Sequence, residues 1–189
     1  MHLDNKNGMS LIEVVVAICI LGLITVPLLN FFLTGNIFTS LARHDVAAVN
    51  TAQEIMEEIK SLPASYLGTA REGSDDTIVL EPKITDDLEG FLVALTGGLG
   101  AGQVREITQY DIPNHRATVS PAWEPNPWEQ NPEYQPTYLV MRNIGSTFPF
   151  EITVEDTEFD GLKKITVTVF YQDRGSRREV SLTTDKFKR

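Results

Sequence analysis

The chain has little of the chemistry that enzymes and metal proteins use. Its 189 residues include one cysteine, Cys19, and three histidines that lie far apart: His2, His44 and His115. A single cysteine cannot form a disulfide within the chain, and histidines at these spacings do not fit a zinc site. We therefore predict that the protein is not an enzyme, needs no cofactor and binds no metal. Its globular part should be held together by an apolar core alone.

Basic residues are scarce relative to acidic ones. Lysine and arginine together number 16, aspartate and glutamate 26, and the formal net charge is −10. A surface that binds nucleic acid carries a basic patch, so we expect no nucleic-acid partner. One small basic group remains, formed by Arg174, Arg177 and Arg178.

Charge is absent altogether from Val14 to Ala42. As a helix, Leu11 to Leu33 would be about 34 Å long at ~1.5 Å per residue, enough to cross a ~30 Å hydrocarbon core. We predict a transmembrane helix over 11–33, because the run is too long for the apolar part of a secretory signal and no A-x-A site closes it. Lys6 precedes the run and no basic residue follows before Arg43, which favours a cytoplasmic N-terminus and an external C-terminal domain.

Two residues conflict with their apolar surroundings. Pro27 lacks a backbone N–H and clashes with the preceding turn, so it should kink the helix or melt a turn. Glu13 places an acid near the start of a membrane-length helix, where a carboxylate costs several kcal/mol unless it is neutralised or paired. Such an acid is a candidate functional residue that needs a partner. The alternative is an acid that only reaches the aqueous edge of the membrane.

The residues from Gly8 to Ile18, Gly-Met-Ser-Leu-Ile-Glu-Val-Val-Val-Ala-Ile, resemble the N-terminus of the type IV prepilin-like family. That family includes pilins, minor pilins and the pseudopilins of type II secretion. The resemblance implies a leader peptide at 1–8, cut after Gly8 by a membrane-embedded prepilin peptidase that then methylates the amine of Met9. The family most often has phenylalanine where Met9 stands. Glu13 matches the family's fifth mature residue, a glutamate, and is expected to form an assembly salt bridge with the N-terminal amine of a neighbouring subunit.

The same resemblance implies a location, partners and a fold. The subunit is expected in the inner (cytoplasmic) membrane, in contact with the peptidase, with an assembly platform and with other pilin or pseudopilin subunits. From there it would enter a type IV pilus or a type II secretion pseudopilus. A proline in the helix of such filaments marks a stretch that can unfold on assembly, which we expect of Pro27. The implied fold is α+β and pilin-like, with a helix over 9–62 packed on an antiparallel sheet.

Beyond the apolar run, the pattern predicts an amphipathic stem over 39–61. Small and apolar residues recur there at helical spacing: Leu41, Ala48, Ala52, Ile55 and Ile59. We expect this stripe to face the sheet. Leu62-Pro63 should end the helix, since the residue before proline disfavours helical conformation.

The residue pattern of the C-terminal part, 138–189, predicts an antiparallel sheet of about four strands. Two runs that alternate apolar and polar residues, 164–171 and 179–183, flank a turn at Asp173–Ser176 and so predict a hairpin. Further strands are expected around 152–154 and 138–142.

The residue pattern of 70–137 predicts a β-rich insertion, with strands near 78–80, 91–95, 103–110 and 116–119. The run from Gly97 to Ile107, followed by Tyr110-Asp111 and Ala117 to Trp123, resembles a β-hairpin motif that recurs in phage tail and other surface-exposed β-rich proteins. That resemblance implies a structural module. The glycines fit a tight turn or bulge, because their spacing matches neither a dinucleotide fingerprint nor a P-loop.

Aromatic residues interleave with prolines from Trp123 to Tyr138. One interpretation is an exposed surface of Trp123, Trp128 and Tyr134 that binds carbohydrate or a partner protein. The other, which we favour, is a proline-rich loop held to the sheet by its aromatic side chains. Aspartate pairs such as Asp75-Asp76 lack the spacing of a calcium loop, so no metal site is predicted.

Two functions from different classes remain open. The motif favours a prepilin-type subunit, either a minor pilin or a pseudopilin. The alternative is a membrane-anchored display protein whose β insertion and aromatic loop bind carbohydrate or a partner. Glu13 distinguishes the two, because only helix-mediated assembly needs it.

Overall fold

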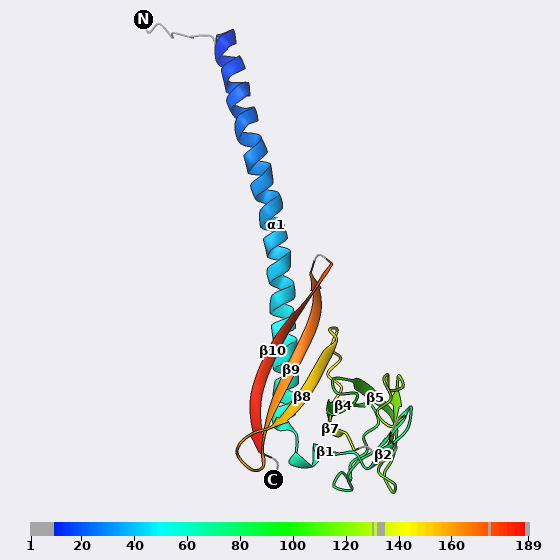
Figure 1. The fold of residues 1–189 in the computed structure, drawn as a ribbon. Coiled ribbons are helices and arrows are strands. Elements are labelled where there is room, and N and C mark those ends of the chain that lie inside the picture. Colours follow the sequence, from blue (N-terminus) through cyan, green and yellow to red (C-terminus); the bar gives the residue numbers. More distant parts are fainter. Residues whose placement is uncertain (1–9, 130, 132–134, 174, 188–189) are drawn as a thin grey trace, which may run out of the picture. The chain divides into compact units, whose positions relative to one another are not determined.

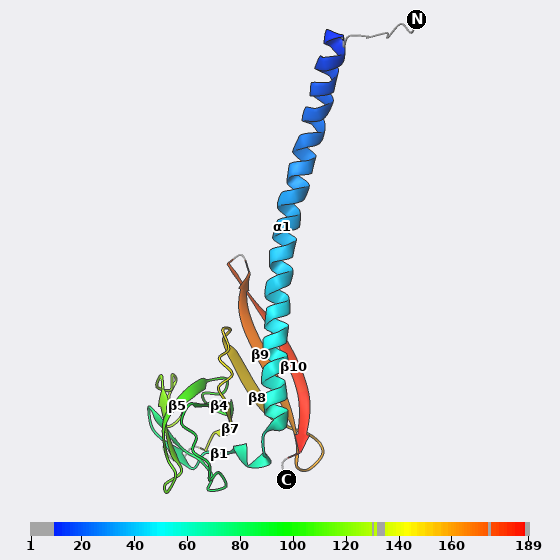
Figure 2. The same ribbon diagram turned by 180° about the vertical axis from the view of Figure 1, so that it is seen from behind.

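The computed structural model describes residues 10–129, 131, 135–173 and 175–187, with the backbone only at 40 and 41. The chain divides into two compact units, residues 1–43 and 44–189, which we describe separately. One helix, α1 (Leu11–Ser61), crosses the boundary between them. It is followed by a short 3-10 helix (Ala64–Tyr66) and by strands β1 to β10. Figures 1 and 2 show these elements from two opposite sides.

The part of α1 in the first unit is apolar and carries its side chains on the surface. Leu23 is 76% exposed and Phe31 is 75% exposed. The hydroxyls of Thr25 and Thr39 donate to the carbonyls of Leu21 (2.6 Å) and Gly35 (2.9 Å), one turn earlier. These polar groups are thus satisfied within the helix, as a hydrocarbon environment requires. By length and composition α1 can cross a membrane.

The backbone of α1 remains helical through Pro27. The sequence predicted either a kink or a melted turn at this residue, and the melted turn is wrong for this structure. A proline removes one i→i−4 hydrogen bond, and the long helical stretches on both sides keep the backbone helical in spite of that loss.

From His44 onward α1 belongs to the second unit and packs through one stripe. The predicted stripe is confirmed for four residues that are fully buried: Ala48, Ala52, Ile55 and Ile59. The side chain of Leu41, its fifth predicted member, lies outside the described residues. The helix ends at Ser61, ahead of Pro63 as predicted.

The C-terminal end of α1 is closed by the last strand. The ammonium of Lys186 donates to the backbone carbonyls of Ile59 and Leu62, each at 2.6 Å. Carbonyls in the last turn of a helix have no partner within it, so a lysine there supplies both a hydrogen bond and a favourable charge. Burial lowers the pKa of Lys186.

Three antiparallel strands lie alongside this part of α1 (Figures 1 and 2). They are β8 (Phe150–Asp156), β9 (Leu162–Asp173) and β10 (Ser176–Phe187), in the order β10-β9-β8. The predicted hairpin is confirmed, with Val169 opposite Val180 and Val167 opposite Leu182. The hydroxyl of Tyr171 donates to Asp45 at 2.6 Å and joins the sheet to the helix.

The remaining strands form a separate sheet in the order β1-β7-β4-β5-β6-β3-β2. Their bounds are β1 (Leu67–Thr69), β2 (Glu72–Gly73), β3 (Thr77–Val79), β4 (Phe91–Gly97), β5 (Val104–Asp111), β6 (Arg116–Ser120) and β7 (Thr137–Arg142). The predicted strands of the middle segment are confirmed as β3, β4, β5 and β6, and the β-rich region is larger than expected.

One boundary predicted from the sequence is wrong. Residues 138–142 were assigned to the C-terminal sheet, but β7 lies between β1 and β4 in the seven-stranded sheet. The C-terminal sheet accordingly has three strands among the described residues, and the expected number was about four. Residues 138–141 are all buried, and a continuous apolar run shows that a strand is internal without showing which sheet contains it.

Candidate functional site

The first turn of α1 places Glu13 at the N-terminal edge of the apolar helix. The carbonyl of Ser10 accepts hydrogen bonds from the backbone N–H groups of Glu13 (3.0 Å) and Val14 (3.2 Å). The Glu13 side chain is exposed in the single chain. An acid in a first helical turn also interacts favourably with the helix dipole, by about 0.3–1 kcal/mol. Gly8 and Met9, the predicted cleavage and methylation sites, lie outside the described residues.

Large apolar side chains cover the surface of α1 in the first unit. In addition to Leu23 and Phe31, Leu11 is 83% exposed and Phe38 is 66% exposed. A soluble surface rarely carries so many neighbouring apolar residues, and a continuous exposed patch marks contact with a membrane or with protein. This helix surface is therefore the clearest candidate functional feature of the first unit.

The two tryptophans are buried. Trp123 is 4% exposed and Trp128 is 3% exposed, and their rings meet edge to face with centroids 6.3 Å apart. The guanidinium of Arg105 lies 5.7 Å from the Trp123 ring centroid. A side chain added at Gly73 would lie 2.6 Å from the Trp128 ring, so the ring packs directly on that backbone.

The interpretation of Trp123 and Trp128 as an exposed binding surface is therefore wrong, and the loop held by its aromatic side chains is confirmed for these residues. Burying rings of this size stabilises the fold more than exposing them would. Tyr134, the third member of the predicted surface, lies outside the described residues.

The glycine-rich segment forms the tight turn that its composition predicts, between β4 and β5. Gly100 and Gly102 have φ of +80° and +88°, which residues with a side chain rarely adopt. After the turn, the Gln103 amide donates to the carbonyl of Pro125 (2.9 Å) and its oxygen accepts from the backbone N–H of Glu124 (2.7 Å). The turn is thus tied to the proline-rich loop and has a structural role.

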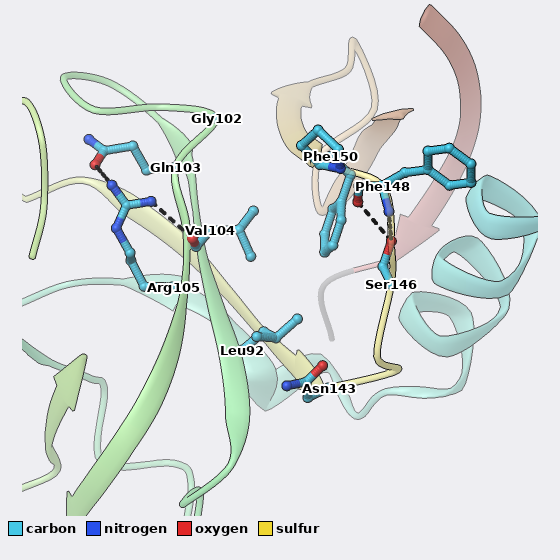
Figure 3. Close-up of a pocket in the computed structure, with 10 residues that line it drawn as sticks. Leu92, Gly102, Gln103, Val104, Arg105, Asn143, Ser146, Phe148 and Phe150 are labelled. Carbon is cyan, nitrogen blue, oxygen red and sulfur yellow. Dashed lines mark hydrogen bonds between the residues drawn. The ribbon is translucent and has the colours of Figure 1, made fainter. Parts of the chain in front are cut away.

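An open groove of about 450 Å³ lies between β4, β5 and the segment 143–150 (Figure 3). Leu92 and Val104 line one side and Phe148 and Phe150 the other. The Arg105 guanidinium donates to the oxygen of Gln103 at 2.8 Å. Burial lowers the pKa of Arg105.

The described residues that line this groove do not include a nucleophile paired with a base. The hydroxyl of Ser146 donates to the carbonyl of Phe148 (2.8 Å) and accepts from its N–H (3.2 Å), so it is engaged by its own loop. No histidine or acid lines the groove among the described residues, and a serine nucleophile needs an adjacent base. Elsewhere in the described part of the chain, no three His, Cys, Asp or Glu side chains gather where they could hold a metal ion.

Sequence reasoning did not single out the aromatic residues around this groove. Phe148 and Pro149 lie between β7 and β8, and Phe150 is the first residue of β8. The residue pattern gave no reason to distinguish them from the neighbouring strands. A Phe-Pro-Phe cluster at a strand boundary was the available signal, because proline keeps its position out of a strand interior.

Comparisons with protein-family models, with curated proteins and with solved structures gave no match. Function therefore has to be inferred from the features above.

Proposed function

We propose that the chain is a prepilin-type subunit, a minor pilin or pseudopilin that assembles through its N-terminal helix. A prepilin peptidase would cut after Gly8 and methylate Met9. The subunit would span the inner membrane once, with its N-terminus cytoplasmic and residues 44–189 external. It would then join a type IV pilus or a type II secretion pseudopilus.

The observation that carries this proposal is one acid on the first turn of an otherwise uncharged, exposed apolar helix. Glu13 is followed by no charged residue from Val14 to Ala42. The surface of that helix needs a membrane or neighbouring helices to cover it. Both coverings have a low dielectric, in which an unpaired carboxylate is costly.

An amine on a neighbouring subunit is the partner that best relieves this cost. Within one helix, Glu13 lies only about 6 Å along the axis from Met9, at ~1.5 Å per residue. Helices packed with an axial stagger can therefore bring the Met9 amine of one subunit to Glu13 of the next. Breaking such a pair by removing one partner is strongly destabilising, by about 3–5 kcal/mol in buried sites.

Fewer observations support the alternative, a membrane-anchored display protein. The buried tryptophans remove its proposed aromatic surface, and the groove beside Phe148 is the feature that still favours it. A display protein needs its helix only as an anchor, and any charge at position 13 would then serve equally.

The first test is the intact mass and N-terminal peptide of the full chain extracted from membranes, with and without a prepilin peptidase. We expect a chain that begins at methylated Met9 only when the peptidase is present. A chain that still begins at Met1, or that is cut between residues 35 and 40, would rule out the prepilin function.

The second test separates assembly from anchoring. Glu13→Gln should reduce incorporation into filaments by about tenfold or more while leaving membrane insertion unchanged, because it removes the charge that pairs with the amine. Glu54→Gln is the matched control, since Glu54 is an exposed acid on the same helix. Equal incorporation of the two variants would favour the display protein.

A further inference from the structure

The turn between β8 and β9 presents an aromatic side chain to solvent. Phe159 is 70% exposed. The turn is ordered by its own hydrogen bonds: the hydroxyl of Thr157 lies 2.9 Å from the Leu162 carbonyl and accepts from the N–H of Phe159 (3.3 Å). The N–H of Leu162 donates to the Phe159 carbonyl at 3.1 Å. Phe159 is therefore held out on a defined turn, and an aromatic side chain presented in this way suits a contact with another molecule.

Two acids without ion pairs flank this phenylalanine. Glu158 and Asp160 are exposed. The preceding acids pair across the hairpin, Glu155 with Lys164 (3.8 Å) and Asp156 with Lys163. In the described part of the chain Glu158 and Asp160 form no ion pair, so the tip of the turn carries an aromatic ring between two uncompensated negative charges.

A groove of complementary character lies at the other end of the same sheet. It has a volume of about 490 Å³ and is lined by Phe148, Pro149, Phe170, Tyr171, Gln172 and Arg177. The guanidinium of Arg177 stacks 3.9 Å from the Phe170 ring centroid. Arg177 forms no ion pair with any described residue and is exposed, so the groove combines aromatic walls with one uncompensated positive charge.

The groove is open because β8 is shorter than β9. Their last paired residues are Phe150 and Val169, and just beyond them the N–H of Phe170 donates to the Pro149 carbonyl at 2.9 Å. Residues 171–173 of β9 continue past that point, paired with β10 on one side only among the described residues. Gln172 thus lies on an open strand edge beside the groove, where an incoming backbone can also form hydrogen bonds.

Phe159 cannot reach the groove of its own chain. Between Leu162 and Gln172 the strand β9 spans about 33 Å at ~3.3 Å per residue. The turn and the groove stand at opposite ends of that strand, so a ring that fills the groove has to come from another molecule.

We propose that the groove is filled by the 157–162 turn of a second copy of this chain. Phe159 inserts beside Phe148 and Phe170, and Glu158 and Asp160 lie against Arg177. The two surfaces differ, so the contact is heterologous: each copy offers a turn at one end and a groove at the other. Contacts of this kind continue from copy to copy unless a rotation closes them into a ring. The proposal extends the assembly function above but uses different residues from the helix pairing at Glu13.

Photo-crosslinking in the full chain tests this contact. Phe159 is replaced by p-benzoylphenylalanine, which keeps an aromatic ring, in chains grown in unlabelled medium. These chains are mixed in detergent with unmodified chains grown separately in ¹⁵N medium, and the mixture is reconstituted into membranes. After irradiation we expect crosslinks between light and heavy chains that join position 159 to peptides containing 148–149 or 170–172. Absence of such crosslinks, or crosslinks only to other peptides, would overturn the contact.

A second aromatic position provides the matched control. Phe187 is 61% exposed and pairs with Leu162, so it lies at the same end of the sheet as the turn. The photoreactive residue at position 187 should not crosslink to the peptides that line the groove. If it marks them as strongly as position 159 does, the specific seating of Phe159 is wrong.

Charge exchange tests the polar part of the contact. Arg177→Glu should lower the crosslink yield about tenfold or more, because like charges then face each other across the contact. Combining Arg177→Glu with Glu158→Lys and Asp160→Lys in one chain should restore the yield, and failure to restore it would contradict the proposed pairing. A crosslink in chains that still begin at Met1 would support this contact and reject the prepilin function. Chains that begin at methylated Met9 but give no crosslink would support the prepilin function and reject this contact.

Discussion

The two parts of α1 have the same secondary structure and opposite surroundings. Leu23, in the first unit, is 76% exposed, whereas Ile55, in the second, is fully buried against the chain's own sheet. The second part has a narrow apolar stripe between charged residues, and the first is mostly apolar, with no charged residue from Val14 to Ala42. An amphipathic helix matches a covering that the protein supplies itself, and a uniformly apolar helix needs one from outside the chain.

Core truncation should show this difference most strongly. Ile55→Ala should lower the free energy of unfolding of the second unit by about 2–5 kcal/mol, because it leaves a cavity between helix and sheet. Leu23→Ala should change it by less than about 0.5 kcal/mol. Urea unfolding of both full-length variants in detergent measures the difference, and equal losses would contradict the difference between the two parts of α1.

A charge in the apolar part should have the next largest effect, on membrane insertion. Leu23→Lys places an ammonium near the centre of the proposed span, at a cost of about 2.5–3.5 kcal/mol. Gln53→Lys, on the exposed face of the stem, is the control. Carbonate extraction of membranes should release the first variant and retain the second. If carbonate releases both variants, α1 is not held by the hydrophobic interior of the membrane; if it retains both, the expected cost of the charge at position 23 is wrong.

The smallest effect is a pH dependence confined to the second unit. The hydroxyl of Tyr66 donates to Asp86 at 2.8 Å, and burial together with this carboxylate raises the pKa of Tyr66 to about 12. An unfolded tyrosine ionises near pH 10. The folded chain therefore retains a proton that the unfolded chain loses, so this stability is complete below pH 10 and lost as the pH rises through about 12.

Urea unfolding at several pH values from 9 to 12 tests this pH dependence. Tyr66→Phe should flatten the fall in stability between pH 10 and 12. An unchanged slope would show that other groups cause the alkaline loss; burial also raises the pKa of Tyr138. All five tyrosines follow residue 43, at 66, 110, 134, 138 and 171, so no tyrosine of the first unit contributes.

The sequence was a good guide wherever a residue pattern directly reflects its neighbours. The stripe at Ala48–Ile59, the hairpin at 162–187 and the turn at Gly98–Gly102 all follow from local periodicity or backbone preference. The sequence pattern did not show which sheet contains β7, because a fully apolar strand fits the interior of either sheet. The burial of Trp123 and Trp128 depends on partners such as Gly73, which lies 50 residues or more away along the chain.

The candidate sites also differ in how far the sequence alone indicates them. Glu13 could be chosen from sequence because an acid beside a long uncharged run conflicts with its surroundings. The groove beside Phe170 and Arg177 could not, since it exists only because β8 stops short of the end of β9. Its six lining residues come from three segments of the chain and share no motif.

The hydrogen bonds from Lys186 to the end of α1 have a consequence for timing during synthesis. They join residues 127 and 124 positions apart in the chain. The end of α1 cannot form these hydrogen bonds until the last strand has left the ribosome, whereas the apolar segment near the N-terminus can form its helix much earlier. Contacts of such separation also form slowly. Formation of the apolar helix and completion of the second unit are thus separate events, and a translation product that stops before β10 would combine a complete apolar helix with an incomplete second unit.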